Sequence, residues 1–124
     1  MLRVLFASAA LLAGSVIGAA AGDAKGEWLR DSGVSKVRIA SCGGEALCGT
    51  ITWLKDPSGP AKLGQQVFFD MKPHGNNVWT GSAFNPEDGK TYSGKMTLAG
   101  DRLTTAGCVF GGLICKSVCC TRTR

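Results

Sequence analysis

Histidine is almost missing from this chain, together with the side-chain arrangements that most enzymes depend on. The single histidine, His74, lies in the run Pro73-His74-Gly75-Asn76, whose composition favours a turn. No nucleophile, base and orienting group occur in a recognisable arrangement. The sequence therefore predicts no catalytic residues, no metal site and no cofactor, and a protein that is not an enzyme.

Clustered positive charge is also absent. The chain has 14 Lys and Arg residues against 9 Asp and Glu, a formal net charge of +5. Its lysines are scattered over separate segments, whereas a nucleic-acid-binding protein gathers its cations on one helix or stripe. This distribution argues against a nucleic-acid partner and favours a solvated, mildly basic surface. Weak attraction to anionic lipid head groups or cell-wall polymer stays open.

Charged residues are missing from Val4 to Ala21, an apolar run that follows Arg3 and ends in three alanines. A basic tip, a short apolar stretch and small residues at its end are typical of a cleaved secretory signal peptide. The run is too poorly flanked for a stable membrane anchor. We predict a signal peptide at residues 1–21 that is cleaved near Ala21, a single β-barrel domain at residues 22–124, and a periplasmic or secreted product without stable membrane insertion.

All six cysteines follow the predicted signal peptide, and an oxidising compartment allows disulfides to persist. The spacing favours one bond between Cys42 and Cys48, because the glycine pair between them lets the chain reverse within a few residues. The same argument favours a bond between Cys108 and Cys115. Each such short loop stabilises a small domain by roughly 2 to 3 kcal/mol.

Cys119 and Cys120 are then left over, and they point to opposite faces if this segment is a strand. A thiol pair without a special role and an intermolecular disulfide both stay open, so we expect a monomer or a disulfide-linked dimer. A strained vicinal disulfide or a zinc site is less favoured, because the cysteine spacing is not that of a zinc finger or ribbon. No Cys-x-x-Cys motif opens a helix, which argues against thioredoxin-like redox chemistry.

The sequence also lacks a long stretch in which apolar residues recur with the period of a helix. Apolar and polar residues instead alternate with a period of two. Turns rich in Gly, Asn, Asp and Pro separate the alternating segments. The sequence predicts an all-β fold of about eight short antiparallel strands, which form a small up-and-down barrel or a meander; an open or two-layered sheet is the alternative. The expected strands cover residues 26–30, 36–39, 47–53, 66–71, 78–84, 92–98, 102–109 and 117–122.

Two adjacent carboxylates, Glu87 and Asp88, lie in a Pro-Glu-Asp-Gly turn between two aromatic segments. Paired carboxylates can serve acid/base catalysis or bind calcium. In such a turn they more often shape the loop, with the aspartate bonded to nearby backbone amides. We interpret this pair as part of the turn.

The residues around this turn carry a resemblance to a known family. The chain resembles a bacterial family of exported proteins known as domain of unknown function 2147 (DUF2147). The matching segments span nearly the whole mature chain: residues 26–28, 41–44, 47–49, 51–55 and 71–73, the Pro-Glu-Asp-Gly-Lys-x-Tyr-x-Gly hairpin, and residues 107–112. The family's biochemical role is not established, so the resemblance implies no catalytic residues.

The segment Gly26-Glu27-Trp28 also resembles the Gly-x-Trp signature of the first strand of lipocalins. In that family an arginine from the last strand packs across the indole, a part that Arg122 could play here. The resemblance implies a lipocalin-like barrel closed by contact between Trp28 and Arg122. A Trp28 that only fills the core at one end of the barrel is compatible with no ligand at all.

Barrels of this type suggest a binding module for a small hydrophobic or amphipathic ligand. The aromatic residues expected to line such a site are Trp53, Phe69, Trp79, Phe84 and Tyr92. Eight short strands leave room for their own side chains or for one small ligand, so a filled interior stays open. The alternative function is a non-catalytic structural or interaction protein of the cell envelope.

Overall fold

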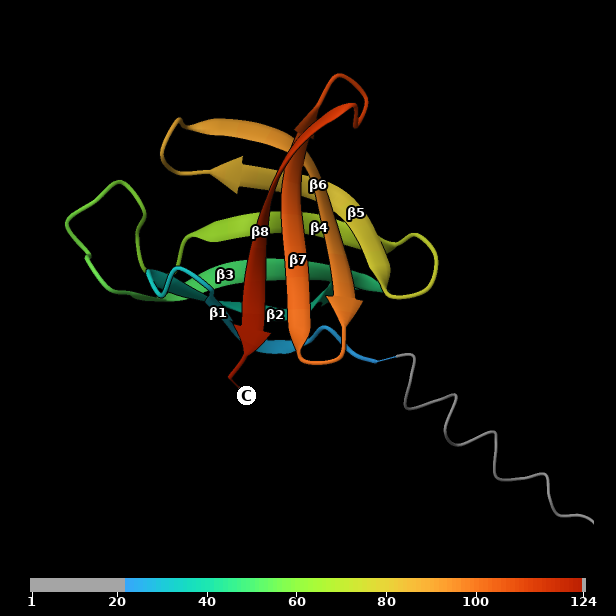
Figure 1. The fold of residues 1–124 in the computed structure, drawn as a ribbon, viewed down its shortest axis with the longest axis horizontal. Helices are drawn as coiled ribbons and strands as arrows, with labels where there is room; N and C mark the ends of the chain where they lie inside the picture. Colours follow the sequence, from blue (N-terminus) through green and yellow to red (C-terminus); the bar gives the residue numbers. More distant parts are fainter. Residues whose placement is uncertain (1–21, 124) are drawn as a thin grey trace, which may run out of the picture.

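A computed structural model describes residues 22–123, which form a closed antiparallel β-barrel of eight strands (Figure 1). The strands are β1 (Gly26–Arg30), β2 (Ser35–Gly43), β3 (Ala46–Leu54), β4 (Gln66–Pro73), β5 (Val78–Asn85), β6 (Lys90–Ala99), β7 (Arg102–Val109) and β8 (Ile114–Arg122). Each strand pairs with the next, and β8 returns to pair with β1. The predicted all-β fold is confirmed, and its closed form replaces the open-sheet alternative.

The predicted signal peptide lies outside the described residues. Within residues 22–123 there is no helix that is both long and apolar enough to cross a membrane.

Alternation of small or apolar residues with polar ones builds the barrel wall. In β6, Gly94, Met96 and Leu98 are buried, while Lys95 between them is exposed. The β5–β6 pair runs without a register shift from Val78 opposite Thr97 to Asn85 opposite Lys90. An uninterrupted period of two therefore gives one inner and one outer face along this hairpin.

The first and last strands close the barrel through one tryptophan and one arginine. Trp28 lies opposite Arg122, whose guanidinium sits 4.4 Å from the centre of the indole ring. Arg122 also donates hydrogen bonds to the carbonyl oxygens of Asp23 (2.7 Å) and Lys25 (3.0 Å). The Trp28 Nε1 donates to the carbonyl oxygen of Ala24 at 2.9 Å. These contacts attach the segment before β1 to the end of β8.

The apolar core fills only one end of the barrel. Its largest fully buried side chains are Trp28, Ile39, Met71, Met96 and Leu103. Leu98 and Leu103, which flank the β6–β7 turn, belong to the same cluster as Ala24. The core is therefore concentrated where the β6–β7 turn and the chain before β1 meet. The opposite end, reached by the β1–β2, β3–β4 and β5–β6 loops, is described below.

A β-bulge near the end of β3 turns Trp53 outward. Trp53 was expected among the aromatic residues that line a site, and the structure places it on the outer face instead. Lys36 pairs with Trp53 while Val37 pairs with Ile51, which leaves Thr52 as an extra residue. Trp53 is 40% exposed, and the Lys36 ammonium lies 5.7 Å from its ring centre.

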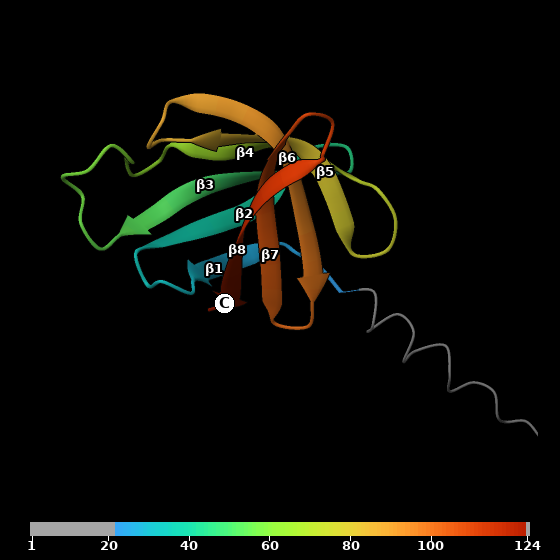
Figure 2. The ribbon, with the colours of Figure 1, turned by 45° about the horizontal axis from the view of Figure 1, so that its top comes forward.

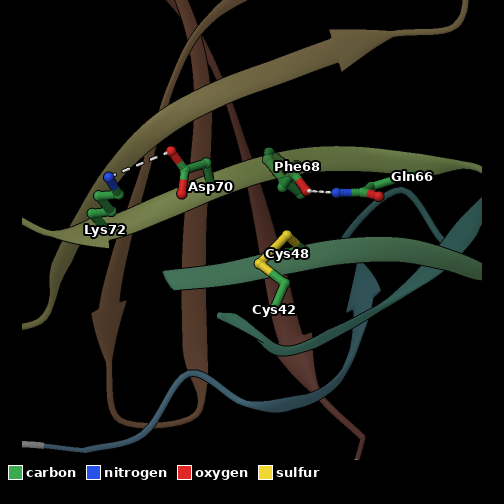
Figure 3. Close-up of a disulfide and its surroundings, with 6 residues drawn as sticks. All are labelled: Cys42, Cys48, Gln66, Phe68, Asp70 and Lys72. Atoms are coloured by element: carbon green, nitrogen blue, oxygen red, sulfur yellow. Dashed lines mark hydrogen bonds and ion pairs between the residues drawn. A yellow bond between two sulfur atoms is a disulfide. The ribbon is translucent and has the colours of Figure 1, made fainter. Parts of the chain in front are cut away.

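A second bulge, in β4, separates Phe69 from the barrel interior. Asp70 has a φ of 51°, and the register with β5 shifts between Phe69 and Lys72. Phe69 is 37% exposed, whereas its neighbour Phe68 packs against the core. The bulge is exposed enough for Asp70 and Lys72 to form a surface ion pair at 3.6 Å (Figure 3).

Both predicted disulfides are present, and each lies within a single hairpin. Cys42 and Cys48 join β2 to β3 beside β4, as Figure 3 shows. Cys108 and Cys115 join β7 to β8, where they are opposite each other in the register. The sequence separations are 6 and 7 residues. The two bonds therefore fasten neighbouring strands and do not bridge distant parts of the barrel.

Candidate functional site

A cavity of about 840 Å³ occupies the end of the barrel that the core leaves open. Its residues come from the strands and from the β1–β2, β3–β4 and β5–β6 loops. In Figure 2 these three loops project from the same side of the barrel. The volume falls within the range of roughly 300 to 1,000 Å³ that is typical of small-molecule sites.

The cavity wall is mainly apolar, because it is made of the inward positions of the strands. Its apolar members include Trp28, Val37, Ile39, Ile51, Val67, Phe68, Ala83, Leu103 and Val118. Trp28 is only 1% exposed and belongs to the packed core as well as to the cavity lining, so the core forms the floor of the cavity. A ligand in this space exchanges its contact with water mainly for contact with apolar side chains.

Among the polar side chains of the inner wall, Thr105 and Cys120 are buried. Thr105 is buried, and its hydroxyl donates to the carbonyl oxygen of Val118 at 3.5 Å. Cys120 is a buried free cysteine that lines the cavity. Cys119 is also free, but it is half-buried and its sulfur lies 3.8 Å from the Thr104 hydroxyl. The adjacent thiols thus belong to different environments.

Burial sets the reactivity of Cys120. Removal from water raises the pKa of the Cys120 thiol to about 11, and the thiolate is the nucleophilic form. We expect iodoacetamide at pH 8 to label the Cys119→Ser variant, which keeps Cys120, at least about tenfold more slowly than the Cys120→Ser variant. The rate for Cys120 should rise with pH up to about 11. Equal rates in the folded proteins would contradict this assignment, and labelling in denaturant is the control.

The Pro-Glu-Asp-Gly turn forms one side of the cavity mouth. The Asp88 carboxylate accepts hydrogen bonds from the Tyr92 hydroxyl and, at 2.9 Å, from the Lys90 amide. The Tyr92 hydrogen bond is the main reason that the pKa of Asp88 lies below its usual range. The Asn85 side chain accepts from the Glu87 amide at 2.9 Å. The structure thus gives Asp88 the turn-shaping contacts that the sequence favoured.

Of the five aromatic residues expected to line a site, Phe84 and Tyr92 lie in the cavity lining. Trp53 and Phe69 are exposed as a result of the two bulges. Trp79 lies at the other end of β5 from the mouth and packs against the core. The structure therefore brings together only the two aromatics next to the β5–β6 turn.

Sequence reasoning missed several residues that the cavity contains. Trp28 was assigned to closure of the barrel or to its core, and Phe68 was passed over for Phe69. Of the three cations that line the mouth, Lys55 and Lys116 were interpreted as part of a scattered surface charge, and Arg30 was not singled out. Period-two alternation places Lys116 on the same face of β8 as Val118 and Cys120, and this signal could have found it.

The single histidine, His74, is a turn residue between β4 and β5. His74 is exposed, and its backbone amide donates to the carbonyl oxygen of Val78 at 2.8 Å. In the part of the chain that the structure describes, no three His, Cys, Asp or Glu residues form a group that could hold a metal ion.

These features define a class, the small closed antiparallel β-barrel with a cavity open at one end. The sequence profile of a family described as an uncharacterized protein conserved in bacteria (DUF2147) matches residues 26–122. The chain belongs to this family, and the match covers every strand of the barrel. No curated protein and no solved structure matches the chain.

Proposed function

We propose that this protein is an exported, lipocalin-like binding module that holds a small hydrophobic or amphipathic ligand in the periplasm or outside the cell. The observation that carries the proposal is the apolar cavity of about 840 Å³ with an open mouth. The lipocalin-like character is supported by the Trp28–Arg122 contact, which closes the barrel at the floor of the cavity.

The core and the cavity share a boundary. Of the five largest fully buried side chains, Trp28, Ile39 and Leu103 also line the cavity, whereas Met71 and Met96 lie in the core cluster alone. A ligand at the open end therefore rests on packed core side chains. A ligand that binds only the folded protein then raises its apparent stability by mass action.

Filling the cavity is expected to abolish this binding. Ala83 is 9% exposed and lies in the cavity wall between Phe68 of β4 and Tyr92 of β6. In Ala83→Trp the larger side chain takes the space that a ligand needs. We expect affinity for the apolar fluorescent probe N-phenyl-1-naphthylamine to fall at least about tenfold, because the lost apolar contact area carries most of the binding energy.

The control is Ala40→Trp, since Ala40 is exposed on β2 and is absent from the cavity lining. Thermal unfolding of both variants checks that the barrel still folds. Failure of the unmodified protein to bind the probe, together with native mass spectra that show no bound ligand, would overturn the proposal. It would favour a structural or interaction role, for which non-reducing electrophoresis would test a disulfide-linked dimer.

A further inference from the structure

We propose that the ligand is an anionic amphiphile, whose apolar chain fills the cavity and whose negatively charged head group is held at the mouth by Arg30, Lys55 and Lys116. This inference rests on the binding function proposed above and names the chemical class of the ligand. It follows from three observations: the inward placement of the cations, their lack of partners within residues 22–123, and the engagement of two of the three nearby acids.

Arg30 is directed toward the cavity by its register. Arg30 lies directly opposite Cys120 in the β1–β8 pair, and residues opposite each other in antiparallel strands share one face of the sheet. Cys120 lines the cavity, and Arg30 lines it as well. Arg30 is the last residue of β1, so its exposed guanidinium lies at the mouth and not in the core.

Lys116 and Lys55 extend this positive region around the mouth. Lys116 is on β8, two residues before Val118, and both belong to the lining. Lys55 directly follows β3, and its backbone amide donates to the carbonyl oxygen of Val34 in the β1–β2 loop at 3.0 Å. The cations thus come from β1, from β8 and from the residue that follows β3, and all three line one opening.

These three side chains make no hydrogen bond or ion pair with the rest of residues 22–123. The described ion pairs use other cations, namely Lys72 with Asp70, Arg102 with Asp31, and Arg122 with Asp101. A cation without a partner, at the edge of an apolar cavity, is available to a ligand and is less screened than one in open water.

Two of the three acids at the mouth, Asp56 and Asp88, are engaged in their own loops, whereas the Glu87 carboxylate makes no hydrogen bond or ion pair within residues 22–123. Asp56 accepts hydrogen bonds from the Ser58 amide at 3.0 Å and the Ser58 hydroxyl at 2.6 Å. Asp88 accepts from Tyr92 and Lys90, as described above. Three cations and three acids line the mouth. All three cations but only one acid, Glu87, are without a partner in the described residues, because Asp56 and Asp88 are bonded locally. The mouth therefore favours a negative head group over a positive one.

The test compares three amphiphiles with the same chain length, dodecanoate, dodecanol and dodecyltrimethylammonium, as competitors of N-phenyl-1-naphthylamine on the mature protein at pH 8. We expect dodecanoate to bind about tenfold more tightly than dodecanol, because an anion gains charge-assisted hydrogen bonds from Arg30. The trimethylammonium compound should bind most weakly. Added salt should reduce the dodecanoate preference.

The variants Arg30→Gln and Lys116→Gln assign the effect to residues. Each should weaken dodecanoate binding about fivefold and leave dodecanol binding unchanged. Lys95→Gln is the matched control, since Lys95 is an exposed lysine on β6 that is absent from the cavity lining. Its dodecanoate affinity should equal that of the unmodified protein.

Equal affinity for dodecanoate and dodecanol would overturn the anionic-ligand proposal and leave the binding function standing. A dodecanoate preference that persists when Arg30, Lys55 and Lys116 are all replaced by Gln would also overturn it, because the cations named here would not hold the head group. Absence of binding by the probe and by all three amphiphiles would instead defeat the proposed function itself.

Discussion

Substituting Gly81 by alanine is expected to lower the free energy of unfolding by about 3 kcal/mol or more. A Cβ at this position would lie 2.5 Å from the carbonyl oxygens of both Phe69 and Asp70. These are backbone atoms of the β4 bulge, so no side-chain rotation relieves the clash. The strand pair must separate at this point, and its hydrogen bonds weaken with it.

Urea unfolding followed by circular dichroism measures the effect. The matched control is Gly59→Ala in the β3–β4 loop, where an added Cβ meets nothing within 4 Å. Gly59, like Gly81, has no positive φ that would strain an alanine. An unfolding midpoint for Gly81→Ala equal to that of Gly59→Ala would show that the bulge is not as close to β5 as described.

Removing the indole of Trp28 is expected to destabilise the protein by about 3 to 5 kcal/mol, the range for truncation of a large buried aromatic residue. Trp28 is 1% exposed and fills the floor of the cavity. The Trp28→Ala variant also loses the hydrogen bond from Nε1 to Ala24 and the ring beneath Arg122. Denaturant unfolding of Trp28→Ala against the unmodified protein gives the size of the loss.

A double-mutant cycle of Trp28 and Arg122 measures how much the contact between the two side chains stabilises the barrel. It separates this contribution from the packing of the indole in the core. Arg122→Ala alone should cost about 2 kcal/mol, because the carbonyl oxygens of Asp23 and Lys25 lose a charged donor. The double variant should be more stable than the sum of the single losses implies, by about 1 kcal/mol for the cation–π contact. Strict additivity would mean that the ring and the guanidinium do not stabilise each other.

The strands themselves could be predicted from the sequence. Regular alternation in residues 92–98 led to the correct β6, and the glycine pairs identified both local disulfides. These features depend on residues that are near one another in the chain, which is why a single sequence carries the signal.

The bulges could not be predicted in the same way. The extra residue at Thr52 exists only relative to its pairing with Lys36 and Val37, and Asp70 adopts a positive φ without being a glycine. Each bulge moves one aromatic residue, Trp53 or Phe69, to the outer face. An alternation pattern read along one strand contains no information about its neighbour's register.

For a related reason, the sequence did not decide whether the barrel encloses a cavity or is filled by its own side chains. Eight strands can enclose either packed side chains or a void, and the outcome depends on the sizes of residues that meet across the barrel. Small residues such as Ala83 at inward positions of the open end favour the void. Which large residues face them is set by three-dimensional packing.

Pairing between β1 and β8 also dictates when the fold can be completed. The two strands that seal the cylinder are the first and the last in the chain, with Leu29 opposite Thr121. Until β8 has been synthesised and has paired with it, β1 presents an unpaired edge, and such edges favour association with other chains. Contacts this distant in sequence form slowly. A nascent chain therefore passes through a period in which seven strands are present and the sheet is still open.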